Sequence, residues 1–114
     1  MSAALKYDLA LNALGDPTRR AIFEKLENGP LSVAYIADGL PVSRSAVSQH
    51  LKVLKEAKLI MMATQGTRSI YSVDQEGLRI IRAYLDRFWD EALANFKRLA
   101  EEMEQQKQSK DNGK

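Results

Sequence analysis

The sequence predicts a mainly helical domain with a small β-hairpin, in the order helix, helix, helix, helix, strand, strand, helix. Two observations point to this fold class. Apolar residues recur at helical spacing along most of the chain, and two β-prone runs flank one glycine-containing polar turn. The length of 114 residues fits one domain, and an apolar fraction of 45% is ordinary for a globular protein.

A glycine and a capping signal separate the first two helices. Apolar residues at helical spacing predict a helix over residues 4–14, which Gly15 ends. Asp16 then stands as an N-cap before Pro17, because proline is favoured at the first position of a helix. The second helix is expected to run to about Glu27, where an Asn-Gly-Pro sequence ends it.

The next two helices are joined by a short turn. Ser32 can cap a short third helix that reaches Ala37, and residues 39–42 contain a glycine and a proline that form the turn. Ser43 can cap a fourth helix that runs to about Ala57. The apolar side of this fourth helix is predicted to consist of Ala46, Val47, Leu51 and Leu54.

A hairpin and a long helix complete the prediction. Residues 59–62 and 69–73 form the two β-prone runs, and Asp74 can cap the last helix. The apolar residues of this helix are spaced three and four apart, close to a heptad pattern. Residues 104–114 are polar without an apolar stripe, so we expect one domain over residues 1–103 followed by a disordered tail.

The positive charge is concentrated in the middle of the chain. Residues 39–73 carry five basic side chains and one acidic one, whereas the segments before and after each carry one more acidic than basic residue. A local basic surface is typical of proteins that bind the phosphate backbone of nucleic acids. A solvated helix face that happens to be basic is the alternative, and charge alone does not decide between them.

Two short helices joined by a turn and followed by a hairpin form a winged helix-turn-helix pattern. In this pattern the second helix enters the major groove of DNA, where polar side chains contact base edges. Lys52 and Lys55 are better placed for phosphates, and Thr67 and Arg68 belong to the hairpin turn. The predicted DNA-binding residues are Arg44, Ser45, Ser48, Gln49, His50, Lys52, Lys55, Thr67 and Arg68.

Several motifs together resemble the ArsR/SmtB family of winged-helix transcriptional repressors. These are the sequence Asp-Pro-Thr-Arg-Arg at residues 16–20, the fourth-helix segment at residues 45–57 and the hairpin segment at residues 66–71. The resemblance spans roughly residues 5–100 and implies a homodimer that binds a near-palindromic operator through its two fourth helices. The implied interface lies on the first and last helices, at Leu5, Leu9, Leu85, Phe88, Trp89, Ala92, Phe96 and Leu99.

The sequence departs from the metal-sensing members of that family. Ser32 and Ala34 stand where the resemblance would place two thiolate ligands, and the chain contains no cysteine. Residues 74–106 contain no histidine, so their carboxylates would be poor ligands for zinc or nickel. We therefore expect no metal site, no cofactor and no thiol switch, and the effector stays unknown.

The sequence predicts a homodimeric, sequence-specific DNA-binding regulator, most simply a repressor of its own or a neighbouring operon. An enzyme is disfavoured because no nucleophile and base are suitably spaced. Neither a signal peptide nor a membrane span is visible, so a cytoplasmic protein is expected.

Three alternatives stay open. Phe88, Trp89 and Phe96 could bind a small-molecule effector rather than a second chain. The domain could instead be a protein-interaction module that uses its last helix as a coiled coil. His50 could be a packing residue rather than a DNA contact.

Overall fold

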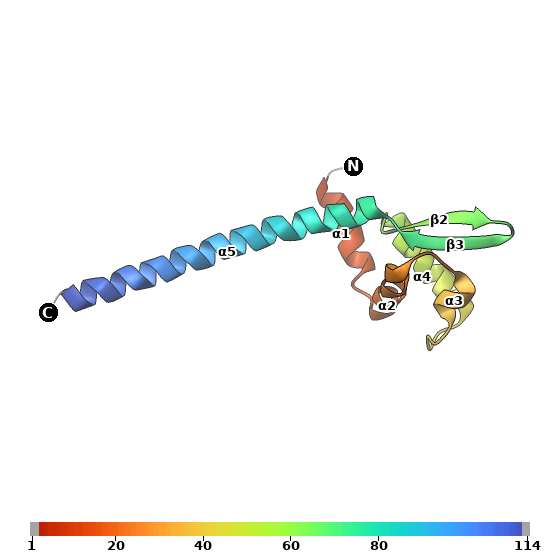
Figure 1. Ribbon diagram of the computed structural model, residues 1–114, viewed down its shortest axis with the longest axis horizontal. Coiled ribbons are helices and arrows are strands. Elements are labelled where there is room, and N and C mark those ends of the chain that lie inside the picture. The colour runs from red at the N-terminus through yellow and green to blue at the C-terminus, as the bar shows by residue number, and fades with distance from the viewer. Residues whose placement is uncertain (1–2, 113–114) are drawn as a thin grey trace. The chain divides into compact units, whose positions relative to one another are not determined.

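The computed structural model describes the backbone of residues 3–112 and the side chains of residues 7–109. It divides into two units, residues 1–82 and residues 83–114. The mainly helical prediction with one hairpin is confirmed, and Figure 1 labels most of the elements. In chain order they are α1 (Ala3–Ala13), α2 (Pro17–Lys25), the 3-10 turn η1 (Leu26–Asn28), β1 (Leu31–Ser32), α3 (Val33–Ala37), α4 (Arg44–Glu56), β2 (Ile60–Gln65), β3 (Arg68–Val73) and α5 (Gln75–Asn112).

Two of the predicted side-chain caps begin α4 and α5. The hydroxyl of Ser43 accepts a hydrogen bond from the backbone N–H of Ala46 at 3.1 Å. One carboxylate oxygen of Asp74 accepts from the N–H of Glu76 at 3.0 Å. Each cap satisfies a backbone donor that has no partner within its helix, which is why both helices begin where the sequence predicts.

The sheet has one strand that the sequence did not reveal. Its order is β1-β3-β2 and both pairings are antiparallel, with Leu31 opposite Tyr71 and Ser32 opposite Ile70. Ser32 also occupies the N-cap position of α3, but its hydroxyl makes no capping bond, so that prediction was wrong. A strand of two residues has no periodicity to detect, and only the partner strand β3 makes it regular.

The hairpin turn is tighter than predicted. Gln65 pairs with Arg68, so Gly66 and Thr67 alone connect β2 to β3. Gly66 has a φ of +66°, which matches the first central residue of a type II′ turn and which only glycine adopts without strain. The hairpin, which we call the wing, extends past α3 (Figure 1).

The hydrophobic core brings together all four N-terminal helices, β2 and the start of α5. On α4 the predicted apolar side is confirmed, because Val47, Leu51 and Leu54 are fully buried and Ala46 is half-buried. Ile81, in the second turn of α5, also joins this core. The buried core residues are Ala10, Ala13, Ile22, Leu26, Ile36, Val47, Leu51, Leu54, Ala57, Leu59, Ile60 and Ile81.

Helix α5 is longer than the sequence predicted. It continues to Asn112, whereas residues 104–114 had been expected to be disordered. The segment consists largely of Glu, Gln and Lys, which have high helix propensity and extend a helix without needing an apolar face. Residues 113–114 lie outside the described part of the chain.

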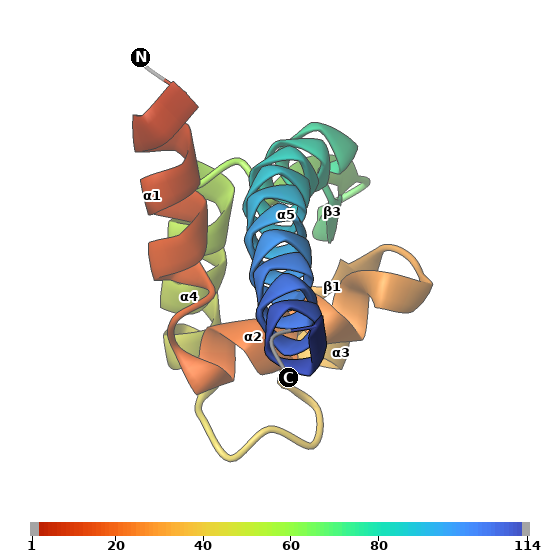
Figure 2. The same cartoon turned by 90° about the vertical axis from the view of Figure 1, so that its left-hand side faces the viewer.

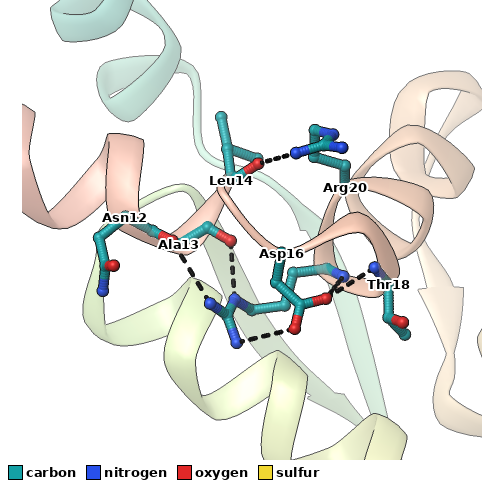
Figure 3. A network of polar contacts seen from close by, with 7 residues as sticks. Asn12, Ala13, Leu14, Asp16, Thr18 and Arg20 are labelled. Atoms are coloured by element: carbon teal, nitrogen blue, oxygen red, sulfur yellow. Dashed lines mark hydrogen bonds and ion pairs between the residues drawn. The ribbon is translucent and has the colours of Figure 1, made fainter.

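The corner between α1 and α2 is held by one carboxylate and two guanidinium groups (Figure 3). Asp16 caps α2 by accepting from the N–H groups of Thr18 at 2.7 Å and Arg19 at 3.2 Å. The Arg19 side chain reaches back to α1, where its Nε donates to the carbonyl of Ala13 at 2.7 Å and an Nη donates to that of Asn12 at 3.3 Å. The same guanidinium lies 3.6 Å from the Asp16 carboxylate.

These contacts give the Asp-Pro-Thr-Arg-Arg motif a structural role. Arg20 likewise donates to the carbonyl of Leu14 at 2.8 Å, so both arginines satisfy the last carbonyls of α1. The pKa of Asp16 is lowered, first by the N–H of Arg19 and further by the N–H of Thr18 and the charges of Arg19 and His50, while partial desolvation opposes this. The ionised carboxylate therefore stabilises the corner.

The start of α5 touches the end of α4 with no room for a side chain. Lys58 has a φ of +64° and follows α4 in a Schellman arrangement, in which its N–H bonds to Lys55 and that of Leu59 bonds to Leu54. A Cβ added at Gly77 would lie 2.0 Å from the carbonyl oxygen of Lys58. Gly77, which is otherwise unfavourable in a helix, is required here by close contact.

Gly77→Ala should therefore destabilise the fold, although the same change in an open helix is stabilising. We expect the free energy of unfolding to fall by about 3 kcal/mol, because the backbones of α5 and of Lys58 must separate. Urea unfolding followed by circular dichroism measures this. Gly66→Ala is the control: nothing lies near its added Cβ, so only the positive φ is strained, at about 1 kcal/mol. A Gly77→Ala protein as stable as the wild type would contradict the contact.

Asp16→Asn should make the free energy of unfolding depend less on pH in the acidic range. Because the pKa of Asp16 in the folded chain lies below its ordinary value of 3.8, its stabilisation is present above that pH and is lost as the pH falls through the folded pKa. Asparagine keeps the capping oxygen but does not titrate. Urea unfolding at pH 5, 4 and 3 should show a steeper loss for the wild type, and parallel curves would argue against the ionised cap.

Candidate nucleic-acid interface

Helix α4 separates an apolar inner face from a polar outer face. Val47, Leu51 and Leu54 lock the inner face into the core, and this fixes the direction of every other side chain on the helix. Six of the predicted DNA-binding residues are exposed on α4, namely Arg44, Ser45, Ser48, Gln49, Lys52 and Lys55. The polar residues that could contact base edges thus begin at the N-terminal end of the helix, as in DNA-reading helices.

His50 lies at a different angle from these six residues. Its side chain is half-buried, and its charge acts on the carboxylate of Asp16 at the start of α2. Residue 50 is therefore turned partly toward the α1–α2 corner rather than fully outward. The sequence left a DNA contact and a packing role open for this residue, and its half-buried side chain leaves room for both.

The wing brings a further arginine to the side of α4. Thr67 and Arg68 are both exposed at its turn. Arg68 and Arg44 line the same hollow of about 370 Å³, although 24 positions separate them in the chain. The folded hairpin thereby brings the first residue of β3 to the same hollow as the first residue of α4. The sequence alone did not predict that these two residues lie together.

Tyr35 belongs to this surface although no sequence pattern singled it out. It lies on α3, is 64% exposed and lines the same hollow as the two arginines. Its neighbour Ile36 is fully buried, and adjacent residues of a helix point about 100° apart. Because Ile36 was a predicted apolar position of this helix, the residue before it could have been expected to point away from the core.

The basic residues of this surface are available for an anionic partner. In the part of the chain with described side chains, Arg44, Lys52, Lys55 and Arg68 form no ion pair or side-chain hydrogen bond. In contrast, Arg19 and Arg79 each pair with a carboxylate three residues away. Unpaired cations on one face raise its positive potential, which favours binding of nucleic acid phosphates.

The residues expected at a dimer interface are exposed in the single chain. Leu9 on α1 is partly open, and the large apolar residues of α5 are about half to three-quarters exposed, with Phe96 at 71%. On α5 they are Leu85, Phe88, Trp89, Ala92, Phe96 and Leu99, which we call the α5 seam. Leu93 and Met103 extend this surface. The side chain of Leu5 lies outside the described residues.

The two positions at which the family resemblance would place thiolate ligands hold no ligating residue. Ser32 is half-buried in β1 and Ala34 is exposed on α3, and neither side chain can supply a thiolate. Among residues 7–109, no three His, Cys, Asp or Glu side chains come together in a way that would hold a metal ion. Within residues 3–112, no helix is long and apolar enough to cross a membrane.

The sequence is similar to those of known transcriptional regulators. A family described as a helix-turn-helix domain matches residues 14–63. The HTH-type transcriptional regulator Rv2034 of Mycobacterium tuberculosis is 52% identical over 99 residues, which cover 87% of this chain and 92% of that protein. The transcriptional repressor SdpR of Bacillus subtilis is 36% identical over 62 residues, covering 54% of this chain and 69% of that protein.

Solved structures agree with the sequence relatives. An ArsR-like transcriptional regulator from Rhodococcus sp. RHA1 superposes with a TM-score of 0.71 at 30% identity, covering 85% of this chain and 94% of that one. The homodimeric winged helix-turn-helix DNA-binding domain of Mb0332 from Mycobacterium bovis gives a TM-score of 0.62 at 27% identity, covering 82% and 88%. On these similarities, the chain belongs to the ArsR/SmtB family of winged helix-turn-helix transcriptional regulators.

Proposed function

We propose that this protein is a homodimeric, sequence-specific DNA-binding repressor. The observation that carries the proposal is the outer face of α4, where polar and basic side chains stand exposed and without intramolecular ion pairs. A helix of this width and chemistry fits the major groove. The similarity to the repressor SdpR supports repression as the outcome of binding.

The residues divide into two roles. Ser48 and Gln49 stand on the outer face of α4, where hydroxyl and amide groups can contact base edges and so select sequence. Lys52 and Lys55 lie further along the helix, and Arg68 lies on the wing. These cations contact phosphates, which set affinity and its salt dependence rather than sequence preference.

Dimerisation is the second part of the proposal. The α5 seam would be an exposed apolar stripe of several large side chains in a monomer, which soluble monomers rarely present. A second copy of the chain covers it, together with Leu5 and Leu9 of α1. The homodimeric state of the Mb0332 domain supports this assembly. Residues 1–103 contain both the DNA-binding and the dimer-forming residues.

The proposed repressor acts without a metal and without catalysis. Ser32 and Ala34 replace the expected thiolates, so metal binding at α3 has no ligands in this chain. Because a repressor acts where the DNA is held, we expect a cytoplasmic protein. A module that docks another protein through α4 is disfavoured, because the outer face of that helix has no large apolar residue.

Two substitutions should separate affinity from specificity. Arg68→Ala should weaken binding to all duplexes and reduce the slope of log K against log salt by about one. Gln49→Ala should instead relax preference at one base position, at about 1–3 kcal/mol if the amide contacts adenine with two hydrogen bonds. Fluorescence anisotropy on a duplex selected from a random pool, and on an unselected duplex, measures both effects at several salt concentrations.

The wild-type protein provides the first test in that experiment. Its affinity for the selected duplex should fall steeply between low and moderate salt, because bound counterions are released as phosphates are contacted. An affinity independent of salt would overturn the DNA-binding proposal. Equal losses on selected and unselected DNA would remove Gln49 from the base-reading residues. Arg98→Ala, on the second half of α5, serves as the charge-matched control.

Phe88→Glu combined with Phe96→Glu should dissociate the dimer. Each substitution places a carboxylate on the α5 seam and removes an aromatic ring, so the dissociation constant should rise at least about 100-fold. Analytical ultracentrifugation at micromolar concentration measures the change, and Glu91→Gln on α5 is the control. A wild-type chain that sediments as a monomer under these conditions would refute the dimer.

A further inference from the structure

A polar hollow lies where three segments of the first unit meet. The start of α3, the first residue of α4 and the first residues of β3 surround a volume of about 370 Å³. Its lining residues are Ser32, Val33, Ala34, Tyr35, Arg44, Arg68 and Ser69. Because Arg44 begins α4 and Arg68 begins β3, a ligand in this hollow would contact both elements.

The hollow has the charge of an anion site. Arg44 and Arg68 supply two guanidinium groups, and no carboxylate is among its lining residues. Neither guanidinium forms an ion pair or a hydrogen bond in the part of the chain with described side chains. Asp38 lines a neighbouring hollow, which shares Ala34, Tyr35 and Arg44 with this one. Two like charges that share one hollow repel each other until an anion lies between them.

The neutral donors around the arginines also favour phosphate. Ser32, Tyr35 and Ser69 each line the hollow with a hydroxyl group. The Ser32 hydroxyl is not used as the cap of α3, and Tyr35 is 64% exposed. Guanidinium and hydroxyl groups both donate hydrogen bonds, and phosphate oxygens accept several at once.

Strand pairing fixes the geometry of the hollow. Ser32 lies opposite Ile70 in the β1–β3 ladder, and Gln65 lies opposite Arg68 at the wing turn. The first helix of the helix-turn-helix is therefore joined to the wing by backbone hydrogen bonds rather than by a flexible loop. The backbone of β1 and of β3 is therefore fixed beside the hollow before a ligand arrives, which lowers the entropy lost on binding.

We propose that this hollow binds one phosphate of the DNA backbone, held between Arg44 and Arg68 with Tyr35 as a hydroxyl donor. The inference rests on the proposed DNA-binding function and makes it more specific. Arg44 then acts on the backbone, where it sets the position of α4 in the groove, and not on a guanine base as its helix position alone suggests. Tyr35 becomes a DNA contact outside α4 and the wing.

A double-mutant cycle tests whether the two arginines share one phosphate. Arg44→Gln and Arg68→Gln should each weaken binding to the selected duplex about tenfold, as expected for a charge-assisted hydrogen bond. The double variant should be weaker than either single variant but by less than the product of the two single losses, because both arginines bind one phosphate and their contributions are coupled. Tyr35→Phe should weaken binding about fivefold. Arg98→Gln, which removes a guanidinium from the second unit, should leave affinity within twofold.

A chemical change in the DNA tests the same point without altering the protein. Replacing backbone phosphates one at a time by uncharged methylphosphonates should reveal one phosphate in each half-site whose replacement weakens the wild type, weakens both Arg44→Gln and Arg68→Gln less, and hardly affects the double variant. Multiplicative losses in the double variant, or different phosphates for the two arginines, would overturn the inference. Wild-type protein that binds no duplex in a salt-dependent way would instead refute the proposed function itself.

Discussion

The arrangement of this domain depends on the burial of one side of α4. Val47, Leu51 and Leu54 are fully buried against the other helices and β2, and an apolar stripe of this kind allows a helix only one rotation about its axis. A turn of one residue, about 100°, would carry Lys52 toward the core and leave Leu51 in water. The same packing that stabilises the fold therefore determines which residues can face DNA.

The helix caps, the two faces of α4 and the hairpin could be predicted from the sequence, because each depends on residues close together in the chain. The caps at Ser43 and Asp74 depend on a side chain and a backbone N–H only two or three residues apart, so the sequence contains both partners. The two faces of α4 follow from a spacing of three and four residues. The hairpin was predicted for the same reason, since its strands flank Gly66 directly.

Two features that could not be predicted, the strand β1 and the hollow beside the wing, depend on contacts between segments distant in the sequence. The strand β1 exists because β3 lies beside it, and a two-residue segment has no pattern of its own. Arg44 and Arg68 line one hollow only once the wing has folded back. Tyr35 belongs to the candidate site because it lines the same hollow. The helical state of residues 104–112 was missed for a different reason: the absence of an apolar stripe says little about a segment rich in strong helix formers.

The contact between Gly77 and Lys58 has a mechanical consequence. Because no side chain separates the first turns of α5 from the backbone that follows α4, these two segments cannot slide past each other while the contact lasts. The Asp74 N–H also bonds to the Leu59 carbonyl, which adds a second connection at the same junction. The first turn of the helix that would hold two subunits together is thus packed directly on the backbone that ends the helix that would read DNA.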